Sequence, residues 1–444
     1  MPMQPGRSMR EPSAGRAGGG DSGPGGEGPL AGRLGAAESR RGPTEGRRGV
    51  LIAGYYGYGN LGDEAILESL LGDLTALLPH HAFRVLTAGS ACARRARVEF
   101  LPRLQPRAIL EAMRRSQLLV LGGGSLIQDS TSLRSLLYYL GLIWLAKRFG
   151  LKAAIYGGGI GPVTTPRGRA LARAVLPQVD LLALRDRRSM EEALSLGVAG
   201  ERLVLTADPA FAAASSCAAV PPGVGGGVGD RVQRGVAGDE AADRALDASG
   251  VPAGARGRLL GISLRPPMAP ADIAAMAEAA DSLAAGRHGL FPLFLPFHPE
   301  YDTDTLVAVG RAMRSPSAVL QGVADPGTLR SVVGRLRVAV AMRLHAAIFA
   351  VGAGVPCVAL SYDPKVDALV EDVPALAHAR YPGIAGPEVA AAVERLVLAR
   401  DELRPELLAS AQRLAQRARV NAAAVSSLVL RGGYPGHGQD GLEV

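Results

Sequence analysis

The chain has 444 residues, enough for two or three domains of ordinary size, and 48% of its residues are hydrophobic. Its formal net charge is +8, and arginine supplies nearly all of the positive charge. Because the arginines are scattered and no basic run is interleaved with aromatic residues, we expect no nucleic-acid partner; anionic small molecules or an anionic lipid surface fit this charge better.

Three features bear on the cellular location. The sequence shows no apolar stretch typical of a signal peptide near its start. The longest apolar candidate, Leu133–Gly150, has an uncharged core over 135–146, which is shorter than the ~20 residues that a membrane span needs, so it predicts a buried helix. The cysteines, Cys92, Cys217 and Cys357, form no CxxC pair, which indicates free thiols in a reducing compartment. We therefore expect a cytoplasmic protein.

Composition divides the chain into two folded domains and three low-complexity segments. Residues 1–48 are rich in glycine, proline and charge, and predict a disordered tail. Residues 213–258 include PPGVGGGVGD and GVPAGARGR, which predict a Gly/Pro-rich linker, and residues 431–444 predict a second tail. The two domains then occupy residues 49–212 and 259–430.

Within each domain, short β-rich runs alternate with helical patterns, which predicts parallel sheets of βαβ units. Helix Asp63–Leu78 illustrates the pattern, because its leucines recur at helical spacing. A last helix, about Arg404 to Leu428, has no strand after it and is expected to pack back across the domain junction. The fold class predicted is α/β, with two doubly wound Rossmann-like domains that face a cleft. The predicted strands are Val50–Ala53, Phe83–Thr87, Leu118–Leu121, Ala153–Tyr156, Leu181–Leu184, Leu203–Thr206, Leu259–Leu264, Leu290–Pro296, Ala318–Leu320, Val338–Ala341 and Cys357–Leu360.

Glycine-rich turns follow several strands of the first domain: GYYGYGNLGDE, GGGSLIQDSTS and GGGIGP. Ligands of doubly wound sheets bind beyond the carboxyl ends of the strands, so these turns predict a binding site. Asn60 or Asp63 can equally cap the helix that begins there. A dinucleotide site is disfavoured, since no acidic residue closes the strand Phe83–Thr87. Polar groups beside the turns suit a hydroxyl-rich ligand, and the candidates are Asn60, Gly62, Asp63, Ser125, Gln128 and Asp129, with Arg185 as a further anion contact.

Cationic or titratable side chains follow the strands of the second domain. Arg343 and His345 also open a helix, where free N–H groups and the helix dipole favour anions. His298 and Lys365 can equally be an ordinary core residue and a surface ion pair. The residues at these strand ends, which together predict a site for a small and strongly anionic ligand, are Arg265, His298, Arg343, His345 and Lys365.

With these motifs in view, the sequence resembles the polysaccharide pyruvyl transferases of the CsaB type. The matching motifs are GYYGYGNLGDEAIL, GGGSLIQDSTSLRSLLYYL, GGGIGP, the LRD–S run, TADPAF, SLRP, the MRLH turn and VPCVALSYDPKV, which run from about Gly54 to Lys365 in the expected order. The resemblance covers both domains and leaves out the tails and the linker.

The resemblance implies a GT-B-like fold and transfer of a pyruvyl group from phosphoenolpyruvate onto two hydroxyls of a sugar, as a cyclic ketal. In this family type the acceptor is N-acetylmannosamine of a lipid-diphosphate-linked cell-wall precursor, and the ketal anchors S-layer proteins. The resemblance also implies that Arg265 and the MRLH residues Arg343, Leu344 and His345 lie at the phosphoenolpyruvate site. A lipid-linked acceptor implies peripheral contact with the cytoplasmic membrane face; the segment around Tyr138, Tyr139 and Trp144 is a candidate lipid contact, although a buried helix explains it as well.

The chemistry leads to a hypothesis for the catalytic roles. Arg265 and Arg343 clamp the donor, His345 is the acid, and Asp63 is a weaker candidate for the acceptor-side base. We expect no metal, because the sequence has no HExxH motif, no DxD motif at a strand end and no Cys/His cluster; the DTD run that starts at Asp302 predicts a loop or a helix start. We also expect no cofactor, because phosphoenolpyruvate is a co-substrate.

Two other function classes stay open on the sequence alone. A nucleotide-sugar glycosyltransferase of the GT-B fold is the first, although its donor domain would offer an acidic residue to the ribose. A non-catalytic sugar-phosphate-binding protein is the second, and it would keep the glycine turns but have no use for His345.

Overall fold

The computed structural model describes residues 47–89, 97–130, 132–214 and 228–431. Outside this part of the chain lie residues 1–46 of the predicted tail 1–48, residues 432–444 of the predicted tail 431–444, and Cys92 and Cys217. The strands of the first sheet are β1 Gly49–Ala53, β2 Ala82–Thr87, β3 Val98–Pro102, β4 Leu118–Gly122, β5 Lys152–Gly158, β6 Leu181–Leu184 and β7 Leu203–Leu205. The strands of the second sheet are β8 Leu259–Ser263, β9 Phe291–Phe294, β10 Ala318–Val319, β11 Val338–Ala341, β12 Cys357–Ser361 and β13 Ala377–Arg380.

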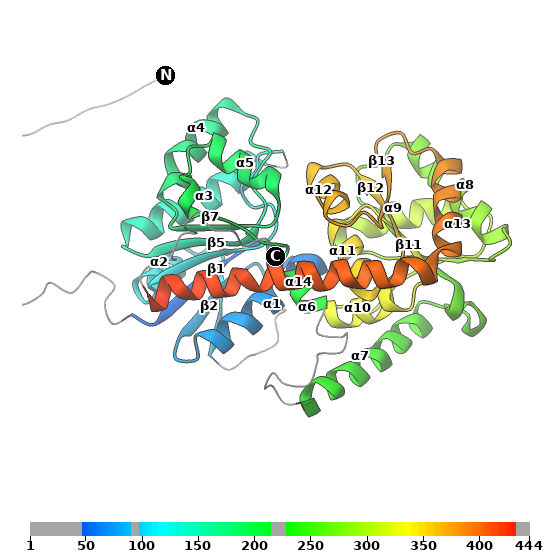
Figure 1. The fold of residues 1–444 in the computed structure, drawn as a ribbon, viewed down its shortest axis with the longest axis horizontal. Coiled ribbons are helices and arrows are strands. Elements are labelled where there is room, and N and C mark those ends of the chain that lie inside the picture. Colours follow the sequence, from blue (N-terminus) through cyan, green and yellow to red (C-terminus); the bar gives the residue numbers. More distant parts are fainter. Residues whose placement is uncertain (1–46, 90–96, 131, 215–227, 432–444) are drawn as a thin grey trace, which may run out of the picture. The chain divides into compact units, whose positions relative to one another are not determined.

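Both sheets are parallel throughout and have the doubly wound strand order (Figure 1). The first is seven-stranded, in the order β3-β2-β1-β4-β5-β6-β7, and the second is six-stranded, in the order β10-β9-β8-β11-β12-β13. In each sheet the order reverses beside the first strand, which is the place where such folds bind ligands. The predicted α/β class with two Rossmann-like domains is therefore confirmed.

The helices of the first domain lie on both faces of its sheet. Alternate residues of a strand point to opposite faces, so Leu51 and Ala53 enter one hydrophobic core while Val50 and Ile52 enter the other. The first core is covered by α2 Pro106–Arg114, α3 Leu133–Arg148, α4 Pro166–Val175 and α5 Arg187–Ser195. The second is covered by α1 Leu61–Leu77 and part of α14 Arg400–Leu430.

The second domain repeats this arrangement. Its sheet carries α8 Pro270–Ala285, α9 Pro299–Ala312 and α13 Gly386–Leu398 on one face. The other face carries α10 Pro326–Gly334 and α11 Leu344–Ala353, and the remaining short helices are α6 Ala210–Ala214 and α12 Pro364–Asp372. Cys357, a buried free thiol as predicted, lies in this second core.

The last helix joins the two domains, as the sequence predicted. Helix α14 packs on α11 of the second domain and on α1, β5 and β6 of the first. Buried Asn421 fixes the contact, because its side chain accepts a hydrogen bond from Thr206 Oγ1 at 2.8 Å and donates one to the Ala207 carbonyl at 3.1 Å.

The predicted linker 213–258 contains a long helix in its described part, residues 213–214 and 228–258, where the sequence had predicted a Gly/Pro-rich linker. Helix α7 spans Val228–Ala248, and its Ala242 and Leu246 are buried in the core shared with α10. Besides its glycines and prolines, this segment contains EAADRALDA, whose alanines and leucine recur at helical spacing.

Candidate active site

The glycine turn after β1 places Asn60 and Asp63 at the start of α1. Gly57 and Gly59 have φ angles of +79° and +75°, which glycine adopts without a steric cost. Asn60 caps α1, since its Oδ1 accepts a hydrogen bond from the Gly62 N–H at 3.2 Å. Its Nδ2 donates to Oδ2 of Asp63. Asn60 therefore shapes the helix start and fixes the orientation of the Asp63 carboxylate.

Asp63 is a buried carboxylate with a raised pKa. Its exposed fraction is 9%. Burial raises the pKa of Asp63 to about 6, because the charged form has lost its water, although nearby His345 acts in the opposite direction. A carboxyl group with this pKa can take up and release a proton close to neutral pH.

His345, on the first turn of α11, lies directly against the start of α1. A Cβ added to Gly62 would stand 2.0 Å from Nδ1 of His345, so only glycine leaves room for the ring. The other ring nitrogen, Nε2, lies 3.7 Å from Oδ2 of Asp208 and is buried without a hydrogen-bond partner among the described residues. The imidazole of the second domain thus meets the glycine-rich turn that follows β1 in the first.

Asp208 and Arg185 form a buried ion pair beside His345. Arg185 Nη1 donates to Asp208 Oδ2 at 3.0 Å, and Arg185 Nη2 donates to Ser125 Oγ at 2.9 Å. Burial acts to raise the pKa of Asp208, but His345, Arg185 and the Ala210 N–H outweigh it and lower the pKa to about 2. Asp208 is therefore ionised at neutral pH, and its carboxylate lies between the Arg185 guanidinium and the His345 imidazole.

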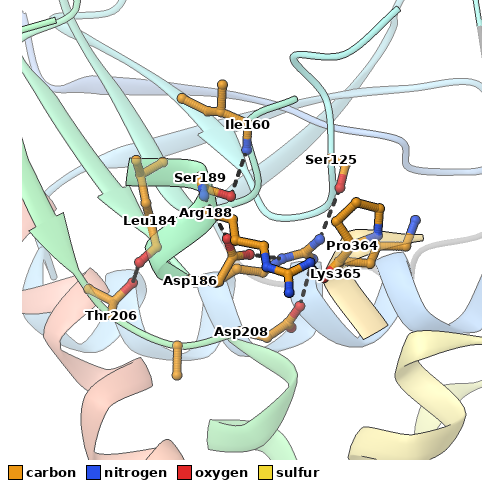
Figure 2. Close-up of polar contacts among 12 residues, drawn as sticks. Ser125, Ile160, Leu184, Asp186, Arg188, Ser189, Thr206, Asp208, Pro364 and Lys365 are labelled. Carbon is orange, nitrogen blue, oxygen red and sulfur yellow. Dashed lines mark hydrogen bonds and ion pairs between the residues drawn. The ribbon is translucent and has the colours of Figure 1, made fainter. Parts of the chain in front are cut away.

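A pocket of about 280 Å³ opens next to this ion pair. One wall is the turn after β5, around Ile160, with the start of α5; the other is the start of α12. Figure 2 shows Ile160, Asp186 and Ser189 on the first wall and Pro364 and Lys365 opposite them. The cationic side chains that line the pocket are Arg185, Arg188 and Lys365, and the acidic ones are Asp186, Glu192 and Asp363.

The cations of the pocket have different partners. Lys365 Nζ lies 3.0 Å from Asp363 Oδ2 and 5.2 Å from the centre of the Tyr362 ring. The Arg265 guanidinium lies 4.7 Å from the centre of the same ring, and its Nε donates to the Pro266 carbonyl at 3.4 Å. Arg188 bonds Glu371 at 2.6 Å. Arg265 and Lys365 therefore share one aromatic support.

Arg343 and His298 have structural partners. Arg343 forms a two-pronged ion pair with Asp302, which is 0% exposed, and Asp302 also accepts the His298 N–H at 2.9 Å. His298 Nε2 donates to the Tyr58 carbonyl at 2.7 Å, and burial lowers the pKa of His298. Asp302 thus belongs to the first turn of α9, as predicted, and Arg343 offers an anion only the N–H groups that Asp302 leaves free.

Asp129 stabilises the turn before α4 with hydrogen bonds. Its carboxylate accepts backbone and hydroxyl hydrogen bonds from Thr164 and Thr165. Burial acts to raise the pKa of Asp129, but these hydrogen bonds together outweigh it and lower the pKa to about 2. Gln128 accepts a hydrogen bond from Ser130 Oγ at 2.6 Å. These contacts give both residues a local role in the turn.

The structure brings Asp63, His345, Arg185 and Lys365 to one junction, and it adds Asp208, which was not among the predicted site residues. The signal for Asp208 was its position, because TADPAF directly follows the sixth predicted strand. Among the described residues, no three His, Cys, Asp or Glu side chains form a group that could hold a metal ion. None of the described helices is long and apolar enough to span a membrane.

A family model described as polysaccharide pyruvyl transferase matches residues 60–364, more than half of the chain. The chain belongs to the polysaccharide pyruvyl transferase family. The match begins at Asn60, includes His345 and ends at Pro364, so it spans the junction described above. No curated protein sequence matches the chain.

Solved structures of low identity share the fold of this pyruvyl transferase. UDP-GlcNAc 2-epimerase from Neisseria meningitidis is similar with a TM-score of 0.55 and 9% identity, over 86% of this chain and 100% of that one. A glycosyltransferase from Rickettsia africae is similar with a TM-score of 0.55 and 9% identity, over 87% of this chain and 100% of that one. The wall teichoic acid polymerase TagF is similar with a TM-score of 0.51 and 12% identity, over 87% of this chain and 89% of that one. These neighbours identify the fold as GT-B-like.

Proposed function

We propose that this family member transfers a pyruvyl group from phosphoenolpyruvate to a sugar of a lipid-linked cell-wall polysaccharide precursor, forms a cyclic ketal and releases phosphate. The observation that carries the proposal is one junction. There Arg185, which lines the pocket together with Lys365, is bonded to Asp208, and Asp208 lies 3.7 Å from the buried Nε2 of His345. Asp63, whose pKa is about 6, lies close to the same imidazole.

The pocket contains cationic side chains that can bind the anionic groups of the donor. Phosphoenolpyruvate carries a carboxylate and a phosphate, and guanidinium and ammonium groups bind such oxygens with charge-assisted hydrogen bonds. Arg185 is the central candidate, because each of its Nη atoms keeps a second N–H after the bonds to Asp208 and Ser125. Lys365, on the facing wall, supplies the second cation. Arg265 shares the Tyr362 ring with Lys365, which supports a donor contact for it as well.

The proton transfers follow from the donor's chemistry. Protonation of C3 turns the methylene into a methyl group and makes C2 electrophilic. One sugar hydroxyl attacks C2 and loses its proton; the second hydroxyl then attacks C2, the C2–O bond to phosphate breaks, and the second proton leaves with phosphate. His345 delivers the proton to C3, since histidine exchanges protons near neutral pH. Asp63 accepts the proton from the first hydroxyl.

The acceptor would lie on the glycine turn of the first domain. Asn60 and Asp63 present polar groups at the start of α1, beside the His345 ring. We propose N-acetylmannosamine carried on a lipid diphosphate as the acceptor. A cytoplasmic location and the absence of a cofactor belong to the same proposal.

Phosphate release from phosphoenolpyruvate tests the function. The purified chain is assayed with and without a synthetic lipid-diphosphate disaccharide that ends in N-acetylmannosamine, and we expect release only with the acceptor. Lys365→Gln should raise the KM for phosphoenolpyruvate by about tenfold or more, the value of one lost charge-assisted contact. Lys152→Gln is the matched control, because Lys152 is a half-exposed lysine on β5 outside the pocket. Turnover of a nucleotide sugar in place of phosphoenolpyruvate would overturn the proposal.

A further inference from the structure

The outer side of α3 has an unusual composition for a surface helix. Its exposed residues form one stripe at intervals of three and four, which in an α-helix is a single face. Leu137 is 44% exposed and Trp144 46% exposed, and the Arg148 guanidinium lies 5.2 Å from the Trp144 ring centre. The stripe consists of Arg134, Leu137, Gly141, Trp144 and Arg148. Its centre is apolar and both ends are cationic.

The neighbouring helices extend this character. Helices α2, α3 and α4 cover the same core of the first sheet, and α4 packs against α3 (Figure 1). Neither α3 nor α4 contains an acidic residue, and the one acidic residue of α2, Glu111, is paired with Arg115. Exposed Leu104 and Leu171 add apolar area. We call this surface the α2–α4 face; its exposed arginines are Arg107, Arg114, Arg115, Arg134, Arg148, Arg167 and Arg173.

We propose that the α2–α4 face binds the surface of a membrane that contains anionic lipids, with Leu137 and Trp144 at the level of the headgroups. Tryptophan is favoured at the membrane–water interface, and basic residues around it are attracted by anionic headgroups. The proposal does not depend on the donor or on the acceptor sugar. Of the segment singled out in the sequence, Trp144 lies on this face, whereas Tyr139 is buried and Tyr138 donates to the Arg103 carbonyl at 2.9 Å.

A second copy of the chain fits this face less well. A twofold dimer would bring the same surface of each copy together, so arginines would face arginines with few carboxylates to pair with them. A bilayer with anionic lipids supplies the missing negative charge. The position also suits a membrane substrate, because α3 begins at Leu133, just beyond the carboxyl end of β4, on the edge of the sheet that carries the candidate site.

The chain contains one tryptophan, so its fluorescence reports on the proposed face alone. The full-length protein is titrated with vesicles of phosphatidylcholine and with vesicles that also contain phosphatidylglycerol. We expect a blue shift of Trp144 emission, and quenching by lipids brominated in the acyl chains, with the anionic vesicles only. The double variant Arg134→Gln/Leu137→Gln should weaken binding at least about fivefold, the effect of one lost arginine near an anionic surface.

A matched control exists on α13 of the second domain. Arg395 and Leu398 have the same spacing as Arg134 and Leu137, and Leu398 is 60% exposed. Arg395→Gln/Leu398→Gln should bind the vesicles like the unchanged protein. Equal weakening by the two double variants, or vesicle binding that leaves Trp144 emission unchanged, would overturn the proposal. A blue shift that grows with protein concentration without vesicles would overturn it in favour of self-association.

Discussion

Asp63→Asn is expected to make the protein more stable and less active. Asp63 ionises at about 6 in the folded chain, against 3.8 for an ordinary aspartate. Between those pH values the folded chain holds a proton that the unfolded chain has lost, so stability falls as pH rises through this window. The pKa shift of about two units means that the buried charge of Asp63 lowers the free energy of unfolding by about 3 kcal/mol at neutral pH. Asparagine has no charge to bury and keeps an oxygen for the Asn60 amide.

Asp208→Asn is the matched contrast, because the pKa shift of Asp208 has the opposite sign. Asp208 ionises at about 2 in the folded chain. Its charge therefore contributes stability that is present above about pH 4 and is lost as the pH falls toward 2. Removing it costs at least about 2 kcal/mol at neutral pH, and it also leaves Arg185 buried without its partner.

Urea unfolding of the unchanged chain and both variants, from about pH 4 to pH 8, checks the pair. We expect Asp63→Asn to raise the free energy of unfolding by about 1–3 kcal/mol at neutral pH, with the gain vanishing near pH 4. Asp208→Asn should lower it over the whole range. Phosphate release by Asp63→Asn should fall despite the added stability. A loss of stability in Asp63→Asn at neutral pH, or a gain that does not depend on pH, would refute the reasoning.

Three further predictions concern His345, the glycine beside it and the ion pair of Arg343. His345→Gln should lower turnover by roughly 10²–10⁴-fold in steady-state assays while the fold stays intact by circular dichroism; near-normal turnover would exclude proton transfer by this residue. Gly62→Ala should displace the His345 ring and lower turnover, whereas Gly72→Ala, an open position on α1, should keep activity and raise stability by up to ~1 kcal/mol in thermal unfolding. Arg343→Gln should lower the free energy of unfolding by about 3–5 kcal/mol, because Asp302 would stay buried without its ion pair, and a change below ~1 kcal/mol would contradict this.

The central strands were predictable because they are buried on both faces. Runs such as Val50–Ala53 and Val338–Ala341 are continuously apolar, and each was recovered to within a residue. Edge strands β3 and β13 were missed, since their residues are only partly buried and alternate with exposed ones, which leaves no apolar run. The β-rich and helical patterns therefore predicted the fold class but missed one edge strand of each sheet.

The sequence indicated which residues lie near the candidate site, but it did not indicate which side chains form ion pairs there. Glycine turns and strand ends pointed to Asp63, His345 and Lys365, because topology brings strand ends to one edge of a sheet. Partners distant in sequence carried no such signal. Asp302 pairs with Arg343 across 41 positions, and Asp208 pairs with Arg185 across 23. Such pairings depend on how helices and turns pack in three dimensions.

The central claim is that the enzyme protonates C3 of phosphoenolpyruvate and leaves a ketal on the sugar. The most direct test is to run the reaction in D₂O with the lipid-diphosphate acceptor and to examine the product by mass spectrometry and NMR. The proposal predicts a ketal whose methyl group carries a single deuterium, together with one released phosphate per product. A product that keeps the C3 methylene as an enol ether, or phosphate release without modification of the sugar, would contradict it.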